Sequence, residues 1–278
     1  MTIKQQKGLQ LSNHVFNLNK IIYCSRSQAG ARKPFSGGSK NNLMIPKSQP
    51  TRKVPDTSMI TFPLPPQGIL EKPPLTLGQE VYAMRQNILQ IWRKGVIEEV
   101  LNTDCDNIQY KLRFEGVHAG KKSVQTKIHS PQELAYIKPA SVRLPVGTRC
   151  IGQYRELPDM PGAYYSGIVA EPPKAINKSR YLVFFDDGYA SYIPHNDIRV
   201  VCKSSPNVTD DIHPNSKSFI QKYLDQYPER PMVKLTPGQV VKTEWDGKWW
   251  ITRVLEVDAS LVRVINPDVL KYNYFFLI

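Results

Sequence analysis

The sequence predicts a mainly β protein of tandem small five-stranded barrels in three copies, with one helix between two copies and a disordered basic N-terminal leader. Three observations support this fold class. A similar succession of strand-like segments recurs three times, residues within those segments alternate between apolar and polar, and one stretch alone shows helical periodicity. Short strands at this spacing are typical of small barrels.

Residues 1–75 form the predicted leader. They contain 11 Lys or Arg against two acids, Asp56 and Glu71, so they hold +9 of the formal charge of +13. Eight prolines between residues 46 and 74 remove backbone donors and favour an extended linker, so we expect order to begin near Leu77. The charge suits a polyanion such as nucleic acid or serves as a nuclear import signal, and it equally suits a solvated segment without a partner.

The three copies are predicted at residues 76–140, 141–203 and 204–278. Each begins with a short glycine-containing loop and a strand, continues through a turn into a second strand, and adds a third strand. The corresponding segments are LGQEVYA, IWRKGVIEEV and YKLRFEG, then VGTRCIGQY, YYSGIVAE and YLVFFDDGYASYI, then PGQVVKTEW, KWWITRVLEV and SLVRVIN. The alternation is clearest in the second copy, and Arg253 interrupts it in the third.

A single helix of about three turns is predicted between the second and third copies, within NSKSFIQKYLDQYPERP. Its apolar stripe comprises Phe219, Ile220, Tyr223 and Leu224. A polar start at Asn215 or Ser216 and a stop at Pro228 bound it. We expect this helix to pack between two barrels and to fix their relative orientation.

Several function classes find no support in the composition. Four widely separated cysteines without a CxxC pair argue against a zinc site or a disulfide framework and favour a reducing compartment. No apolar run approaches the roughly 18 residues that span a bilayer, so an intracellular protein without membrane contact is expected. The five histidines are scattered, and no nucleophile triad, paired-carboxylate site or phosphate loop emerges. The chain is therefore predicted to be no enzyme and to need no cofactor or metal.

The stretch FFDDGYASY in the second copy suggests a binding site. A methylated ammonium keeps its charge but loses donors, so the faces of aromatic rings hold it, each worth about 0.5–2 kcal/mol. Tyr154 would end the first strand of this barrel and Tyr165 would begin the second. Phe185 and Tyr189 would flank the turn after the third strand. Asp187 adds a carboxylate that accepts the remaining N–H of a mono- or dimethylated lysine. The alternative is that these rings form barrel core.

The segments QY, YYSG and FFDDGY resemble the Tudor-domain methyl-lysine readers. In that family the cage is lined by the aromatic ending the first strand, the aromatic before SG, the Phe and second Asp of FDDG, and the following Tyr. The resemblance therefore implies a cage made of Tyr154, Tyr165, Phe185, Asp187 and Tyr189. Tyr154 stands where the family often has Trp, a difference that would weaken the cage.

Residues 75–270 resemble the triple-Tudor region of the SET-domain-bifurcated histone lysine methyltransferases. The likeness is carried by RYLVFFDDGYASYI, FIQKYLDQYPERPMVKLTPGQVVKTEWDGKWW and ITRVLEVDASLVRV. It implies a nuclear chromatin protein that acts in gene silencing. Its implied partners are a histone tail with methylated and acetylated lysine, bound at the groove between the second and third barrels, and chromatin co-repressors.

The other two copies hold incomplete cages. In the third, Trp245 corresponds to Tyr154 and Trp250 to Tyr165, but Ile265 stands where a further aromatic is needed. Two roles for the tryptophans of this copy remain open, covering an acetyl-lysine or packing the seam between barrels. These tryptophans are Trp245, Trp249 and Trp250.

In the first copy, Arg85 takes the first cage position and leaves Trp92 and Phe114 with Glu115. A structural role is therefore expected for the first copy.

Two alternatives to a histone reader remain. The methyl-CpG-binding segment, cysteine-rich zinc cluster and SET domain of a family methyltransferase do not occur in this sequence, which would make the chain a non-catalytic fragment. Because the chain stops after KYNYFFLI, where a barrel should still be completing its strands, we expect a shortened or fragmentary product. The other alternative is a nucleic-acid-binding protein that uses the basic leader and loops, with an affinity that falls steeply as salt rises.

Overall fold

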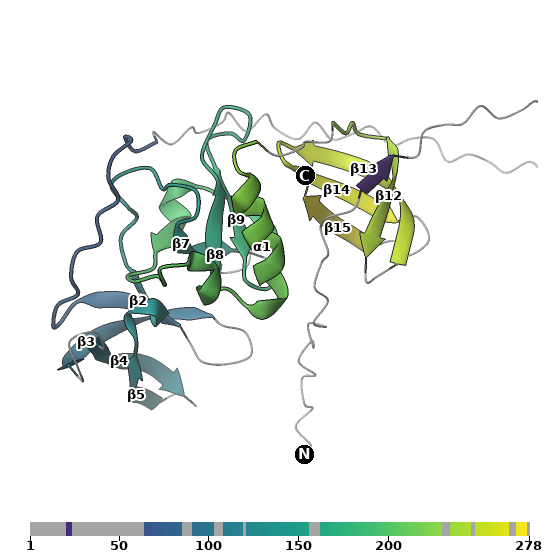
Figure 1. Ribbon diagram of the computed structural model, residues 1–278. Helices are drawn as coiled ribbons and strands as arrows, with labels where there is room; N and C mark the ends of the chain where they lie inside the picture. The colour runs from purple at the N-terminus through teal and green to yellow at the C-terminus, as the bar shows by residue number, and fades with distance from the viewer. Residues whose placement is uncertain are drawn as a thin grey trace, which may run out of the picture.

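Antiparallel strands dominate the computed structural model, which contains a single α-helix in its described part (Figure 1). The described residues are 21–23, 64–84, 91–102, 108–118, 121–155, 162–229, 234–245, 248–266 and 271–276. They form three β units in chain order, which we call unit 1 (residues 80–136), unit 2 (149–200) and unit 3 (240–276). The predicted mainly β fold with one helix is confirmed.

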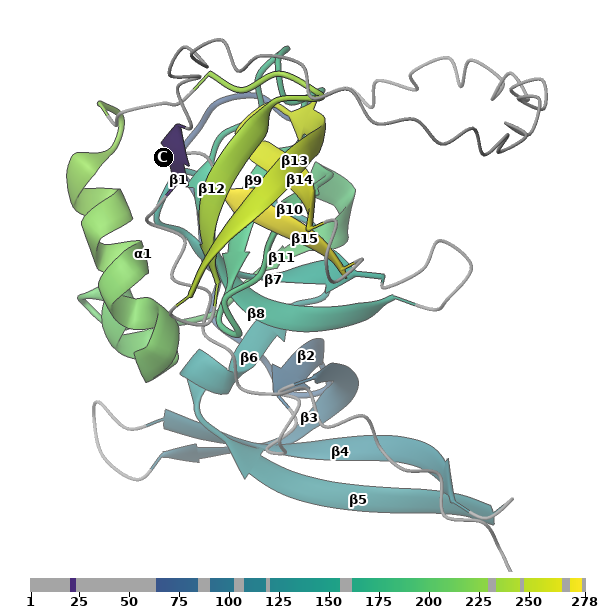
Figure 2. The same ribbon diagram turned by 90° about the vertical axis from the view of Figure 1, so that its right-hand side faces the viewer.

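Unit 1 is a strongly bent sheet with the strand order β6-β2-β3-β4-β5. Its strands are β2 (Glu80–Met84), β3 (Trp92–Asn102), β4 (Ile108–His118), β5 (Lys121–His129) and β6 (Leu134–Tyr136), with the 3-10 turn η1 (Pro131–Glu133) before β6. Alternate residues of these strands, among them Val81, Ile97 and Leu112, are buried and form one core. The hairpin of β4 and β5 extends well beyond this core (Figure 2).

Unit 2 has the strand order β10-β9-β8-β7-β11 and carries the segments that suggested a binding site. Its strands are β7 (Arg149–Tyr154), β8 (Ala163–Glu171), β9 (Tyr181–Phe185), β10 (Ala190–Ile193) and β11 (Ile198–Val200), with η2 (His195–Asp197) between the last two. Every residue of β9 is buried, because unit 2 covers one face of that strand and the helix covers the other. β9 therefore contributes to two apolar cores at once.

The helix α1 (Pro214–Gln226) follows a 3-10 turn η3 (Val208–Asp211) and stands between units 2 and 3 (Figure 1). It begins at Pro214, one residue before the predicted start, because proline fits the first turn, where the N–H has no intrahelical partner. The predicted stripe faces inward, with Ile220 and Tyr223 fully buried. No helix in the described ranges is long and apolar enough to cross a membrane.

Unit 3 is a five-stranded antiparallel sheet with the order β1-β12-β13-β14-β15. Its strands are β12 (Val240–Trp245), β13 (Lys248–Asp258), β14 (Leu261–Asn266) and β15 (Lys271–Phe276), joined at the edge by β1 (Ile21–Tyr23). The sequence segment KYNYFFLI, after which the barrel was expected to be unfinished, includes β15, which pairs with β14 along its whole length.

The expectation that all of residues 1–75 are disordered is corrected in two places. Ile21–Tyr23 forms β1 on β12, as an apolar triplet with an unpaired strand edge beside it can do. Residues 64–75 lie along units 1 and 2, because Tyr136 Oη donates a hydrogen bond of 2.7 Å to the Pro73 carbonyl and Arg143 N–H donates one of 2.9 Å to that of Pro66. Proline lacks a donor but keeps its carbonyl, so this segment is held through its acceptors.

Units 1 and 2 share a continuous sheet through a short pairing of Trp92 in β3 with Tyr164 in β8. Trp92 Nε1 donates a hydrogen bond of 2.8 Å to Ser166 Oγ, and the rings of Tyr82 and Tyr164 lie 4.6 Å apart. A small buried cluster that includes Ile151 fills this seam. The two units are therefore expected to behave as one body.

Units 2 and 3 are joined by the helix and by a buried polar cluster. Glu171 accepts hydrogen bonds from Tyr192 Oη at 3.0 Å and from Ser260 Oγ at 2.6 Å. At the rim of this seam, Arg180 forms a two-pronged ion pair with Asp258, at 2.7 and 2.9 Å. Apolar residues of unit 2, α1 and unit 3 belong to one common core cluster. The predicted packing of the helix between two units is confirmed.

Candidate functional site

Three of the predicted cage rings lie on one face of unit 2. Tyr165 pairs with Gly152, two residues before Tyr154 on β7, and Phe185 pairs with Gly167, two residues after Tyr165 on β8. Because side chains alternate along a strand, residues two apart share a face with each other and with their cross-strand partners. Tyr154, Tyr165 and Phe185 therefore project from three adjacent strands to the same side.

These three rings meet at steep angles. The centroid separations are 6.5 Å for Tyr154 and Tyr165, 6.1 Å for Tyr154 and Phe185, and 6.4 Å for Tyr165 and Phe185. The corresponding angles between ring planes are 75°, 66° and 82°. Aromatic pairs in this range attract each other edge to face, by about 0.5–1.5 kcal/mol each. The rings thus form a mutually supported three-sided cluster.

Exposure differs sharply among the predicted cage residues. Tyr154 is 39% exposed and Tyr189 46%, Tyr165 is half-buried, and Phe185 is only 2% exposed. Within the three-ring cluster, Phe185 is therefore the base and Tyr154 the exposed rim. In this state the face of Phe185 is covered by protein.

The turn from β9 to β10 places the remaining two predicted residues. Phe185 N–H donates to the Tyr189 carbonyl at 2.8 Å, and Gly188 N–H donates to the Phe185 carbonyl at 3.0 Å. Gly188 has φ +92°, a conformation that glycine adopts without a steric cost. The backbone of Tyr189 is thereby held directly across the hairpin from Phe185.

Asp187 is an exposed residue at the tip of this turn, and its carboxylate accepts a hydrogen bond of 3.1 Å from Tyr189 N–H. Its pKa is raised above the ordinary carboxyl value, because nearby protein atoms partly desolvate the carboxylate and because Asp186 lies beside it, although the bond from Tyr189 N–H acts in the opposite direction. Asp187 thus supplies an anion at the edge of the ring cluster.

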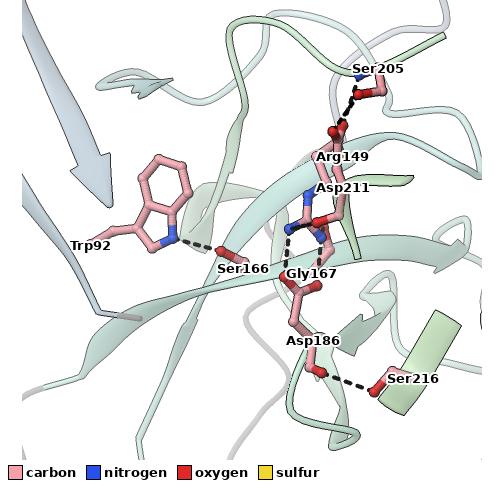
Figure 3. A network of polar contacts seen from close by, with 8 residues as sticks. All are labelled: Trp92, Arg149, Ser166, Gly167, Asp186, Ser205, Asp211 and Ser216. Atoms are coloured by element: carbon pink, nitrogen blue, oxygen red, sulfur yellow. Dashed lines mark hydrogen bonds and ion pairs between the residues drawn. The ribbon is translucent and has the colours of Figure 1, made fainter. Parts of the chain in front are cut away.

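Asp186, the first acid of FDDG, has a different role that the sequence did not reveal. It is 6% exposed and accepts two hydrogen bonds of 2.5 Å from Arg149 (Figure 3). Burial opposes the charged form of Arg149, but attraction and hydrogen bonds to Asp186 outweigh it, so the pKa of Arg149 lies above its usual range. The pair anchors the turn that presents Asp187 and Tyr189.

Further bonds tie this anchor to the surrounding elements (Figure 3). The Asp186 carbonyl accepts from Ser216 Oγ of α1 at 2.9 Å, and its N–H donates to the Ser166 carbonyl at 3.0 Å. Arg149 also donates to the Asp211 carbonyl at 3.0 Å. The network therefore fixes the strand segment that follows Tyr165 and the turn that follows Phe185 in one frame.

Two glycines, Gly152 and Gly167, make room for the ring cluster. A Cβ added to Gly152 would lie 3.2 Å from two ring atoms of Phe185, and one added to Gly167 would lie 2.6 Å from the Phe184 carbonyl oxygen. Gly152 thus lets the Phe185 ring lie across β7, and Gly167 lets β9 approach β8. The glycines in the segments GQY and YYSG were the sequence signal that could have indicated this close packing.

The predicted secondary site in unit 3 is not a single cluster. Trp249 is 41% exposed beside Ile251 and Arg253 on the outer face of β13, whereas Trp250 is half-buried on the inner face with Thr252. Neighbouring residues on a strand point to opposite sides. Trp245 pairs with Lys248, but the side chain of Trp245 lies outside the described residues.

In the described part of unit 1, the residues that correspond to the ring cluster make other contacts. Counting from the strand glycine, Arg93 occupies in β3 the place that Tyr165 has in β8, and Trp92 is buried in the seam between units. The Arg93 guanidinium lies 4.0 Å from the centroid of the Phe114 ring. A cation of the chain itself thus covers the aromatic face in unit 1. The expected structural role of this unit fits these contacts, whereas Arg85 lies outside the described residues.

Comparison with known families and proteins agrees with this architecture. Residues 144–197 match the family described as Histone methyltransferase Tudor domain 1, and residues 235–272 match Histone methyltransferase Tudor domain. Two relatives are the Histone-lysine N-methyltransferase eggless of Drosophila pseudoobscura pseudoobscura, 39% identical over 212 residues, and that of Drosophila melanogaster, 37% identical over 212 residues. The matched part of the chain is a Tudor region of the eggless type.

The Tudor assignment falls on units 2 and 3, so the ring cluster lies within a Tudor domain. The aligned stretch covers 72% of this chain but only 16% of each eggless sequence. This chain thus spans a small part of the relatives' length, and the similarity is to their Tudor region alone.

Proposed function

We propose that unit 2 binds a methylated lysine of a histone tail, with Tyr154, Tyr165 and Phe185 as cage walls. The observation that supports this proposal is the convergence of three rings from three strands, each about 6 Å from the other two. A methylammonium held against such rings gains about 0.5–2 kcal/mol from each, more as water is excluded. A lysine with free N–H donors is better hydrated and would gain less.

The exposed rim residues would have to move for the ligand to enter. Phe185 is covered in this state. Its face would become available when Tyr154, whose ring centroid lies 6.1 Å away, or Tyr189, across the hairpin, turns aside. Both are side chains with large exposed surface, and rotamer changes at binding surfaces are common while the backbone stays in place. Binding would then exchange edge-to-face ring contacts for cation–π contacts, with the Arg149–Asp186 pair holding the frame.

Asp187 and Tyr189 are proposed to set the preference among methylation states. A mono- or dimethylated lysine keeps an N–H that can donate to the Asp187 carboxylate, whereas a trimethylated lysine offers only charge. Tyr189 would close the mouth over the bound group. Asp187 therefore favours the lower methylation states.

The family context supports a role in chromatin for this activity. Since the relatives are named histone-lysine N-methyltransferases, we infer a nuclear location and a non-catalytic reader role for the part represented here. Binding of acetylated lysine and recruitment of co-repressors belong to the same proposal. Nucleic acid remains the rival ligand, and salt dependence tells the two apart because phosphate binding weakens steeply as salt rises.

Calorimetric titration of the full chain with histone-tail peptides that differ only in methylation of one lysine tests the proposal. We expect a methylated peptide to bind at least about tenfold more tightly than its unmodified form, a difference of about 1.4 kcal/mol. Tyr154→Ala should remove most of that preference, whereas Tyr154→Phe, which keeps the ring, should preserve it. Tyr154 is suited to this comparison because its exposure limits effects on folding.

Equal binding of methylated and unmodified peptides across a panel of tail sequences would disprove the cage. Strong binding to a DNA duplex that falls steeply between two salt concentrations, and that Tyr154→Ala leaves unchanged, would favour the nucleic-acid alternative instead.

A further inference from the structure

A second recess lies away from the ring cluster, where the proline-rich segment, unit 2 and the end of α1 meet. It has a volume of about 820 Å³ and is lined in part by Gly68, Leu144, Pro173 and Tyr227. Ligand-binding pockets fall in the range of about 300–1,000 Å³. We propose that this recess, called here the proline cleft, binds an extended acidic peptide segment with apolar side chains.

The walls of the proline cleft are held by specific hydrogen bonds. Arg143 fixes the proline-rich wall through its Nε, which donates to the Pro65 carbonyl at 2.9 Å. Leu144 N–H donates to Tyr181 Oη at 3.2 Å, which ties the floor to the buried strand β9. A surface formed in advance in this way loses little entropy when a partner binds.

The third wall is a loop in an unusual conformation. Lys178 and Ser179 are consecutive non-glycine residues with positive φ, 54° and 59°. The fully buried Asn177 holds the loop, because its Oδ1 accepts from Lys174 N–H at 2.7 Å and its Nδ2 donates to the Pro172 carbonyl at 2.9 Å. Such conformations cost about 1–3 kcal/mol and concentrate at functional sites. Their effect here is to hold the prolines and Lys174 at the cleft.

The charge of the lining points to an anionic partner. Arg143 and Lys174 line the cleft, and no acidic residue does. Within the described part of the chain neither side chain forms an ion pair, so both positive charges remain available. The rest of the lining is largely apolar, including Leu144, Val146 and Leu224. Apolar side chains flanked by carboxylates therefore complement it.

The same charge argues against two other occupants. Residues 1–63 of the chain, which precede the proline-rich wall, carry ten Lys or Arg against one acid, Asp56, so they would be repelled. A basic histone tail is disfavoured for the same reason. A nucleic acid would leave the apolar lining uncovered and meet only two cations, whereas tight phosphate binding uses many. The lining of the proline cleft therefore suits a different class of ligand from the one proposed for the ring cluster.

Fluorescence anisotropy with the full chain tests the proposal. The probes are labelled ten-residue peptides, each with two leucines and three glutamates at varied spacing, and each with a counterpart carrying glutamine for glutamate. We expect at least one glutamate peptide to bind roughly three- to tenfold more tightly than its counterpart, since partly exposed ion pairs contribute modestly. Its addition should shift the amide NMR signals of Gly68 and Gly147.

Lys174→Glu should weaken that binding by a similar factor or more, whereas Lys174→Arg should preserve it. Lys127→Glu is the matched control, because Lys127 is exposed on β5 of unit 1, outside the cleft lining. Binding of a methylated histone peptide should be unchanged by Lys174→Glu, which separates the two sites. The proposal would be refuted if no glutamate peptide bound more tightly than its glutamine counterpart. It would also be refuted if binding survived Lys174→Glu, or if the NMR shifts were confined to other surfaces.

Discussion

Arg149 and Asp186 form a buried ion pair at the centre of unit 2, with both nitrogen–oxygen distances at 2.5 Å and each residue less than 10% exposed. Asp186 adjoins Phe185 at the base of the ring cluster, and Arg149 begins the strand that ends in Tyr154. The pair thus links the strand that carries Tyr154 to the turn that follows Phe185. The two adjacent acids therefore have different roles, since Asp186 is buried in this ion pair whereas Asp187 is exposed.

The first prediction concerns these two acids. Asp186→Asn should lower the free energy of unfolding by about 3 kcal/mol or more, because it leaves the Arg149 charge buried without a partner. Asp187→Asn should change it by less than about 0.5 kcal/mol, as is usual at an exposed site. Chemical denaturation of both variants checks this. Similar losses for the two variants would show that Asp186 does not carry the frame.

The second prediction concerns pH. Because the pKa of Asp187 is raised by desolvation and by Asp186, affinity for a dimethylated peptide should fall as the pH drops through that raised pKa, above the ordinary 3.8. The methylated ammonium stays charged throughout, so Asp187 is the titrating partner. A raised folded-state pKa favours folding as the pH falls, so Asp187 itself does not promote unfolding there. Asp187→Asn should flatten the profile, and an unchanged profile in that variant would assign the effect elsewhere.

The third prediction concerns Gly152. A methyl group there would lie 3.2 Å from the Phe185 ring, so Gly152→Ala should displace that ring by a few tenths of an ångström. We expect a stability loss of about 1 kcal/mol, within the range for mild overpacking, together with weaker methyl-lysine binding. Calorimetry and denaturation measure the two effects. Full methyl-lysine binding by Gly152→Ala would remove Phe185 from the site.

The fourth prediction concerns the seam between units 1 and 2. Trp92→Phe and Ser166→Ala each remove the 2.8 Å bond between these residues and should each cost about 1–3 kcal/mol. Because both variants break the same contact, the double variant should cost less than the sum, with a coupling of about 0.5 kcal/mol or more. Thermal or chemical unfolding of the four proteins tests this. Strict additivity would mean that the bond contributes nothing.

The fifth prediction concerns the seam between units 2 and 3. Glu171→Ala leaves the Tyr192 hydroxyl and Ser260 without their acceptor, so it should cost about 2 kcal/mol or more and allow unit 3 to unfold separately. Arg180→Ala, at the more exposed rim, should cost about 1 kcal/mol or less. Calorimetric scanning distinguishes one transition from two. A single unchanged transition in Glu171→Ala would mean that the apolar cluster, and not the polar contacts of Glu171, stabilises this seam.

Burial also governs the pKa of Tyr192, which is raised to about 12 by desolvation and by the neighbouring Glu171. The hydroxyl is therefore protonated at neutral pH and donates to Glu171. This protonation state is the one on which the fifth prediction depends.

The sequence predicted the shared face of Tyr154, Tyr165 and Phe185 because strand alternation is a local property. Each residue's position relative to its strand end and turn determines the side on which it projects. The same local reasoning found α1 from its apolar stripe, although not its first residue. The same alternation places Trp249 and Trp250, both named as possible acyl-lysine contacts, on opposite faces of β13.

Contacts between distant segments were beyond such reasoning. The FDDG motif presents two adjacent acids, and nothing local shows that Asp186 meets Arg149, 37 residues away in the chain. Trp92 has the appearance of a cage residue until Ser166, 74 residues away, is seen to accept its N–H. The proline-rich segment was predicted to be a linker because prolines lack backbone donors. The sequence does not show which distant side chains donate to its carbonyl groups.

By itself, then, the order of amino acids indicated the main strands, the helix and the set of rings in the proposed cage, because those depend on periodicity and turn chemistry within a few residues. Tertiary structure alone decided which rings touch, which acid is buried and which cation covers Phe114 in unit 1. The physical reason is that burial, pKa and ring contact depend on neighbours that folding brings from far along the chain.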